Sequence, residues 1–180
     1  AIATAILPTL SQQAASDRES VADFNSTLAL GLRLVLVLII PATVGLFVLA
    51  EPAVALLFQR GEFDARDTMM TALALRYYLL GLAFAAVDQP LVFAFYARKD
   101  TLTPALVGVL GVGVYLLVAL ILIRPLGMVG LILANGAQLS GHAAVMLILF
   151  WRQVGSLRGQ GLGMTLLKTG VASAVMAGAT

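Results

Sequence analysis

The sequence contains no cysteine, a single histidine and few charged residues. Without cysteine the chain cannot form disulfides, and one histidine leaves no cluster of soft ligands for zinc or an iron–sulfur centre. Charged residues make up 11% of the chain, against roughly 25% in soluble proteins. The net charge is only +2, and the basic residues are scattered among apolar runs, which argues against a nucleic-acid-binding surface.

Apolar residues, by contrast, make up 61% of the sequence, and the mean hydropathy is +1.00. This balance is typical of a protein embedded in a bilayer, whose hydrocarbon core is crossed by helices of about 20 apolar residues. The 180 residues leave room for about five or six such helices, but for no large soluble domain. We therefore predict an all-α, polytopic integral membrane helix bundle. Both ends lie in apolar runs, and we expect the chain to be part of a larger membrane protein.

Alternating apolar and polar stretches predict membrane spans separated by short loops. In order, we expect the end of a transmembrane helix at 1–10, a cytoplasmic amphipathic linker at 11–27, a transmembrane helix at 28–49, a loop on the opposite side at 50–70, a transmembrane helix at 71–96, a cytoplasmic loop at 97–103, a transmembrane helix at 104–123, a turn on the opposite side at 124–127, a transmembrane helix at 128–151, a cytoplasmic loop at 152–161 and a truncated transmembrane helix at 162–180.

The two sides are assigned from the basic residues, which concentrate in cytoplasmic loops. The loops predicted to be cytoplasmic and the spans beside them hold Arg18, Arg33, Arg98, Lys99, Arg152, Arg158 and Lys168. The opposite loops hold only Arg60, Arg66 and Arg124. The alternation of the loops and the charge bias therefore predict the same topology.

Two polar stretches and one proline allow more than one interpretation. Val21, Phe24 and Leu28 recur at helical spacing, which favours an amphipathic helix on the membrane surface over a solvated connector. In the loop at 50–70 we expect a short apolar helix, after which Asp64 or Asp67 caps the next span. Pro41, near the middle of its span, is either a candidate hinge or a kink held by packing.

Asp88 lies near the centre of the apolar segment at 71–96. An intramembrane carboxylate is costly unless it is paired, hydrated or protonated, so Asp88 is a candidate functional residue. Arg76 precedes it by twelve residues, about 18 Å along a helix axis, so a partner must come from another helix or from the part of the protein outside this chain. Alternatively, Asp88, Gln89 and Pro90 mark a local break whose polar groups satisfy one another.

A second polar feature lies in the segment at 128–151, where Asn135, Gln138 and His142 share one helix face. Such a stripe either joins helices by hydrogen bonds or lines a wet cavity, and the first use is the commoner.

Four motifs, ILPTLS, LLFQRGEFDARDT, FYARKDTLTP and RPLGMVGL, occur in this order along the chain. As an ordered set they resemble the MurJ (MviN) family of bacterial lipid II flippases, within the superfamily of multidrug, oligosaccharidyl-lipid and polysaccharide exporters. The resemblance covers essentially all 180 residues. It implies a fragment of the C-terminal lobe of a fourteen-helix exporter-type fold, from the end of the eighth helix to the start of the thirteenth.

The resemblance also implies a function. Members of the family carry the undecaprenyl-linked peptidoglycan precursor, lipid II, from the cytoplasmic to the periplasmic leaflet by alternating access, for cell wall synthesis. It implies a multi-pass protein of the bacterial cytoplasmic (inner) membrane, with lipid II, membrane lipids and other cell-wall synthesis proteins as partners and no nucleic acid. The arginines that relatives use to hold the diphosphate and sugars lie mainly in helices outside this chain.

We expect no enzymatic activity, no catalytic residue, no cofactor and no metal. Some relatives bind a cation through the seventh, eleventh and twelfth helices, and the matching eleventh-helix positions here hold Tyr115 and Ala119, which departs from that pattern. Because a polar head group needs a hydrated, charge-lined path through hydrocarbon, we hypothesise that the intramembrane polar residues line the substrate pathway or support the lobe interface: Asp88, Gln89, Asn135, Gln138 and His142.

Three alternatives compete with this interpretation. One is an exporter of another lipid-linked oligosaccharide or amphiphile on the same fold. Another is a non-transporting membrane scaffold of a cell-wall complex, which would tolerate apolar replacements at Asp88 and Gln138. A membrane-embedded enzyme using Asp88 or His142 as a base is disfavoured, because the short loops offer no nucleophile, base and orienting group together.

Overall fold

The computed structural model describes residues 2–15, 20–154 and 160–179, and within these ranges the chain forms seven α-helices. They are α1 (Ile2–Ala15), α2 (Ser20–Val48), α3 (Ala50–Phe58), α4 (Ala65–Ala97), α5 (Leu102–Leu126), α6 (Met128–Gln153) and α7 (Leu162–Gly178). Four of them, α2, α4, α5 and α6, are long and apolar enough to cross a membrane, and α7 is a shorter apolar helix.

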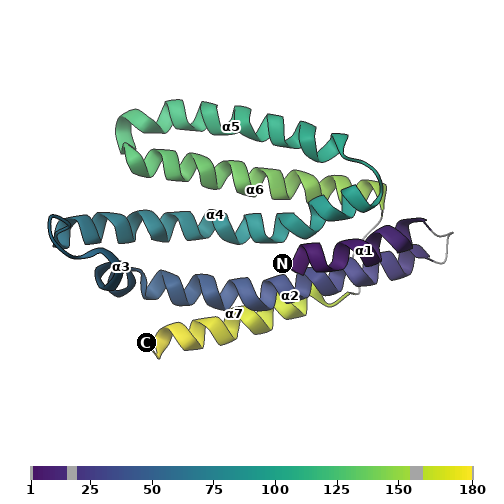
Figure 1. The fold of residues 1–180 in the computed structure, drawn as a ribbon, viewed down its shortest axis with the longest axis horizontal. Coiled ribbons are helices and arrows are strands. Elements are labelled where there is room, and N and C mark those ends of the chain that lie inside the picture. The colour runs from purple at the N-terminus through teal and green to yellow at the C-terminus, as the bar shows by residue number, and fades with distance from the viewer. Residues whose placement is uncertain (1, 16–19, 155–159, 180) are drawn as a thin grey trace.

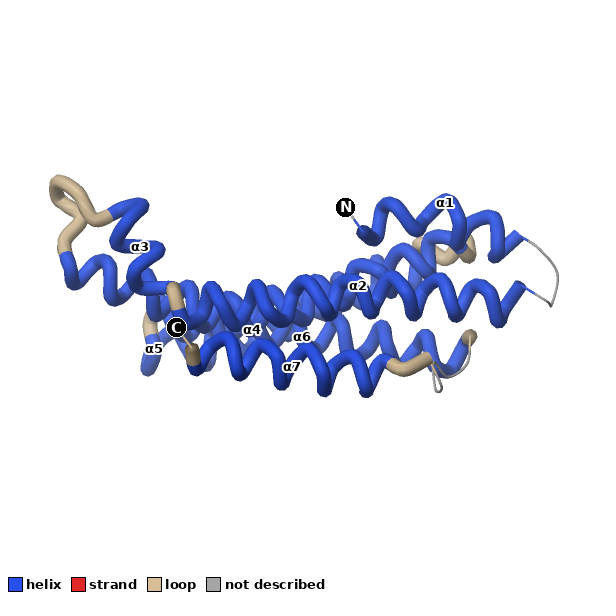
Figure 2. Tube along the Cα trace, turned by 90° about the horizontal axis from the view of Figure 1, so that it is seen from below, coloured by secondary structure: helices blue, strands red, loops and turns tan. Residues whose placement is uncertain are grey.

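The four long helices lie side by side in the order α5, α6, α4 and α2 (Figure 1). Because α4 and α6 run in one direction and α2 and α5 in the other, the connections gather at the two ends of the bundle (Figure 1). Figure 2 shows α1 and α7 on opposite faces of this layer, and both pack against α2. The α4–α5 connection lies at one end, and α3 and the α5–α6 turn lie at the other.

The largest cluster of buried apolar side chains joins α1, α2, α4 and α6 near one end of the bundle. It includes Leu10, Phe24, Leu28, Leu91, Phe95, Met146 and Phe150. Phe95 and Phe150 stack edge to face with their ring centroids 6.5 Å apart. The outer faces of the long helices expose large apolar side chains instead, which suits contact with lipid or with other membrane helices.

The stretch at 11–27 differs from the predicted surface linker. Its first residues continue α1 as far as Ala15, and its last residues form the beginning of α2. Phe24 is only 3% exposed and packs in the core cluster beside Leu28, because its helical spacing continues the apolar face of α2. The prediction of a separate surface helix is therefore wrong for the described residues. Arg18, used above to assign the sides, lies outside them, as does Arg158.

The stretch at 50–70 contains more helix than predicted. The short apolar helix, α3, begins at Ala50, and α4 begins at Ala65 rather than at residue 71. The Asp64 carboxylate accepts the backbone N–H groups of Arg66 and Asp67, and the Asp67 side chain accepts the N–H of Asp64. This reciprocal capping box confirms the predicted cap and explains the early start of α4, which is 33 residues long, about 50 Å.

The turn predicted at 124–127 is shorter in the structure. Arg124 and Pro125 lie in the last turn of α5, and the connection to α6 is the single residue Gly127 with a φ of 55°. That angle belongs to the left-handed region, which glycine adopts without steric cost. α5 and α6 therefore form a tight antiparallel hairpin.

The connection between α4 and α5 is held by hydrogen bonds at both helix ends. Lys99, with a φ of 62°, donates its N–H to the Tyr96 carbonyl, and Asp100 donates its N–H to the Phe95 carbonyl, which is a Schellman ending. Asp100 then accepts the backbone N–H of Thr103 at 3.0 Å and its hydroxyl at 2.7 Å, and so caps α5.

Replacing Asp100 by alanine should lower the free energy of unfolding by about 1 kcal/mol near neutral pH, because α5 loses its cap. The bonds from the Thr103 hydroxyl and then from its N–H lower the pKa of the Asp100 carboxyl. A carboxyl with a lowered folded-state pKa stabilises the protein above its unfolded-state pKa of about 4 and loses that effect as the pH falls through the folded-state value. Thermal unfolding of the full-length protein in detergent should therefore show a difference between wild type and Asp100→Ala that shrinks below about pH 4. Thr103→Val, which removes one donor, should show a smaller difference with the same pH trend.

Candidate intramembrane polar site

Asp88 lies on a continuous stretch of α4. The helix runs from Ala65 to Ala97 through Asp88, Gln89 and Pro90, so these residues do not form the local break considered from the sequence. Pro90 is buried inside the helix, where the loss of its N–H removes one helical hydrogen bond without ending the helix. Asp88 must therefore be satisfied from outside its own helix.

The partner of Asp88 is His142 on α6. Nδ1 of His142 lies 2.8 Å from Oδ2 of Asp88, within ion-pair distance, although the ring N–H is not directed at that oxygen well enough to form a hydrogen bond. The side chains are 13% exposed for Asp88 and 16% for His142. The second carboxylate oxygen, Oδ1, is buried and has no hydrogen-bond partner in the part of the chain that the structure describes.

A close approach of two helices brings the pair together. A Cβ atom at Gly81 of α4 would lie 3.0 Å from the Cα atom of Gly136 on α6, so a larger residue at position 81 would have to push the two backbones apart by a few tenths of an ångström. Asp88 follows Gly81 by seven residues and therefore lies on the same face of α4, toward α6. His142 lies less than two turns beyond Gly136 on α6. The small residues thus set the helix separation that lets the two side chains meet.

Gln138 and His142 also contact α5. A Cβ atom at Gly111 of α5 would lie 3.4 Å from Cγ of Gln138 and 4.0 Å from Cδ2 of His142. Both side chains line a cavity of about 100 Å³ between α5 and α6. His142 thus faces α4 with Nδ1 and α5 with the opposite edge of its ring.

The other candidates from the sequence are not joined to this pair. Gln89 is exposed, although it is the neighbour of Asp88. Asn135 is half buried on α6, seven residues before His142, about 10 Å along the axis. Pro41 lies within α2, which is helical on both sides of it. The structure therefore reduces six candidates to a pair, Asp88 and His142, with Gln138 beside it.

Arg76, for which no role was predicted, lies in α4 toward the opposite end of the bundle from the Asp88–His142 pair. Its Nε donates to the carbonyl oxygen of Phe47 at 3.1 Å, and its guanidinium lies 5.9 Å from the centre of the Phe47 ring. Phe47 is in the last turn of α2, where carbonyl groups have no partner in their own helix. Arg76 thus stabilises the end of α2, and its charge is compensated by the helix dipole.

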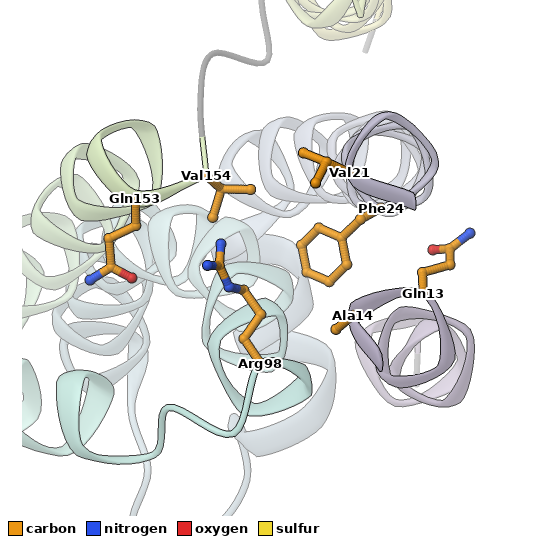
Figure 3. Close-up of a pocket in the computed structure, with 7 residues that line it drawn as sticks. All are labelled: Gln13, Ala14, Val21, Phe24, Arg98, Gln153 and Val154. Atoms are coloured by element: carbon orange, nitrogen blue, oxygen red, sulfur yellow. The ribbon is translucent and has the colours of Figure 1, made fainter. Parts of the chain in front are cut away.

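A separate cavity of about 190 Å³ lies at the end of the bundle that holds the α4–α5 connection. Figure 3 shows Arg98 reaching into it from the end of α4, between Phe24 of α2 and Gln153 of α6. It is also lined by Gln13, Ala14, Val21 and Val154. A cation and amide groups at this position can hold the carbonyl or phosphate oxygens of a polar head group.

A family model described as Lipid II flippase MurJ matches residues 1–180. The chain belongs to the MurJ lipid II flippase family. This MurJ-family chain is 33% identical over 150 residues to a protein of Haemophilus influenzae and 36% identical over 135 residues to one of Vibrio cholerae, both named "Probable lipid II flippase MurJ". The family resemblance noted in the sequence is thereby confirmed.

A solved structure entitled "Lipid II flippase MurJ, inward closed conformation" has the same fold. Its TM-score with this MurJ-family chain is 0.80 at 24% identity, over 98% of this chain and 35% of that one. The Haemophilus match covers 81% of this chain and 29% of the relative, and the Vibrio match covers 75% and 25%. The matches thus cover between a quarter and about a third of the length of these proteins, and the chain is a multi-pass part of a larger helical membrane protein.

Proposed function

We propose that the protein of which this chain is a part moves lipid II from the cytoplasmic to the periplasmic leaflet of the bacterial inner membrane by alternating access, without catalysing a reaction. The observation that carries the proposal is the family match over all 180 residues. The named relatives support it as well. We also propose that the end of the bundle with the α4–α5 connection faces the cytoplasm, since Arg98 and Lys99 lie there.

The chemistry of the chain is consistent with a cargo that has a polar head and an apolar tail. A polar head group crosses hydrocarbon only along a hydrated, charge-lined path, because each unsatisfied polar group costs several kcal/mol in lipid. Asp88, His142 and Gln138 are polar groups inside the spans that can support such a path at the lobe interface. An apolar cavity of about 460 Å³ lies beside them, lined among others by Leu36, Val87 and Ala143, and a lipid chain fits such a surface.

The test uses the full-length protein in a bacterial strain depleted of its own flippase. We expect the lipid-linked precursor to reach the periplasmic leaflet, where it becomes accessible to an added enzyme, only when the protein is present. A precursor that stays in the cytoplasmic leaflet while the protein is folded and inserted would contradict the proposal. Rescue by such a protein of a strain defective in another lipid-linked glycan would then favour the alternative cargo.

The role of the polar residues is tested in the same strain. Asp88→Asn with His142→Ala should reduce precursor translocation at least tenfold, if the pair supports the pathway. Full translocation by this double variant at wild-type protein levels would remove the two residues from the proposed pathway and leave the family function in place.

A further inference from the structure

Asp88 and His142 form a buried pair of titratable groups from two different helices, and their joint proton count sets the local charge. With one proton between them the pair is neutral overall, either as carboxylate and imidazolium or as carboxylic acid and imidazole. Removing that proton leaves a lone carboxylate, and adding a second leaves a lone imidazolium. Both are strongly disfavoured at a desolvated position between membrane helices.

Among the residues that the structure describes, no other charge pairs with Asp88 or His142 to compensate such a change. Within the described residues, no lysine or arginine nitrogen lies within 4.0 Å of the Asp88 carboxylate, and no other carboxylate lies that close to His142. Among the helices that pack on α4 and α6, α1 carries no titratable side chain. α2 carries Asp23 in its first turn and Arg33, which packs over Gly161 at the start of α7, and α3 carries Glu51 in its first turn. α5 carries Tyr115, one turn beyond Gly111, and Arg124 in its last turn, thirteen residues from Gly111 and so about 20 Å along the axis.

Two further features show that the pair is poised for proton exchange rather than sealed. Oδ1 of Asp88 is buried and has no hydrogen-bond partner among the described residues, so the carboxylate has a vacant acceptor where a proton can reside. His142 also borders the cavity of about 100 Å³ between α5 and α6, where Gln138 is the other polar side chain of a mostly apolar lining, so the ring is not packed on every side. A purely structural pair would use every hydrogen-bonding atom.

We propose that the Asp88–His142 pair is a proton-binding site, which holds one shared proton while it is buried and exchanges it with water when the transporter exposes the pair. A hydronium ion gives its proton to the pair, so one O–H bond of hydronium breaks, one O–H or N–H bond forms on the pair, and a water molecule is left; release is the reverse step. Protonation then favours the conformation in which the pair is buried, and loss of the proton favours the one in which it is hydrated. The inference deepens the proposed function by naming the ion that the site binds.

The test is pH-difference infrared spectroscopy of the full-length protein in liposomes, with the proton itself as the ligand. We expect a carboxylic-acid carbonyl band that changes with pH in the wild type and disappears in Asp88→Asn. His142→Gln, which keeps the carboxyl group but removes the second titrating site, should move the pH at which the band changes. Asp23→Asn makes the same chemical change at an exposed first-turn residue of α2 and should leave the band unaltered.

Distances between spin labels on the two lobes give a second readout. For one proton, the ratio of the two conformations should change up to about tenfold per pH unit in the wild type, and this dependence should be lost in Asp88→Asn. An identical pH response in wild type and Asp88→Asn, or no pH response in the wild type, would overturn the inference. If Asp88→Asn does not fold, an infrared band that His142→Gln leaves at its wild-type pH overturns it as well.

These readouts do not depend on the cargo. A protein whose infrared band titrates as expected but which leaves lipid II in the cytoplasmic leaflet would retain the proton site and lose the proposed function. A protein that translocates lipid II but shows no band that titrates with pH would retain the proposed function and lose the proton site.

Discussion

Replacing His142 by leucine should lower the free energy of unfolding of the full-length protein by about 3 kcal/mol. The substitution fills a similar volume, but it leaves the Asp88 carboxylate among apolar side chains without the group that lies 2.8 Å from it. Removing one member of a buried pair is costly because the remaining charge has no compensation, whereas removing both members is often nearly neutral. Most of the lost stability should therefore come from the unpaired Asp88 carboxylate, and less from the contacts that the histidine ring made.

The double variant Asp88→Asn with His142→Leu distinguishes this cause from a packing defect. It should recover most of the lost stability, since no charge remains buried, in reversible unfolding measurements of the protein in detergent or bicelles. Gln89→Leu is the matched control, because it replaces a polar residue at the next position of α4 that is exposed in the structure, and it should change stability by less than about 0.5 kcal/mol. If the double variant is no more stable than His142→Leu alone, packing around residue 142 explains the loss.

The polar residues show how far the sequence determines the candidate site. The position of Asp88 in an apolar segment predicted a partner on another helix, and the stripe of Asn135, Gln138 and His142 included that partner. Which of the three residues meets Asp88 depends on how far α6 slides along α4, and that is set by the contact between Gly81 and Gly136. Gly81 and Gly136 are 55 positions apart in sequence, and the periodicity of apolar residues within one helix does not predict which residues of two helices meet.

The helix boundaries show the same limit. Apolar runs identified the segments that cross the membrane, because hydrocarbon imposes their length. The ends of the helices, however, are fixed by local hydrogen bonds and by packing. Asp64 and Asp67 start α4 well before the apolar run, and Phe24 belongs to α2 because it is buried against the other helices. Arg76 likewise gains its role from the end of α2, which a sequence reading cannot place beside it.

Replacing Gly130 by alanine should lower the free energy of unfolding by about 2 kcal/mol. A Cβ atom at this position would lie 2.7 Å from the carbonyl carbon of Leu122 on α5, and closer still to its oxygen. Since these are backbone atoms of the tight α5–α6 hairpin, the clash is relieved only if the two helices move apart. Thermal or denaturant unfolding of the full-length protein in detergent measures the loss, and Gly113→Ala is the control, because it adds the same methyl group to α5 where no atom lies within 4 Å.

Gly31 offers a comparison with Gly130, because a Cβ atom at Gly31 would meet a side chain and not backbone atoms. A Cβ atom at Gly31 of α2 would lie 2.6 Å from Cδ1 of Ile6, the flexible end of a side chain on α1. Shortening that side chain with Ile6→Val should therefore restore most of the stability that Gly31→Ala removes. Shortening Leu122 to alanine cannot restore Gly130→Ala in the same way, because the obstructing carbonyl remains. Recovery of Gly130→Ala by Leu122→Ala would show that side-chain packing, rather than the approach of the two backbones, sets the spacing of α5 and α6.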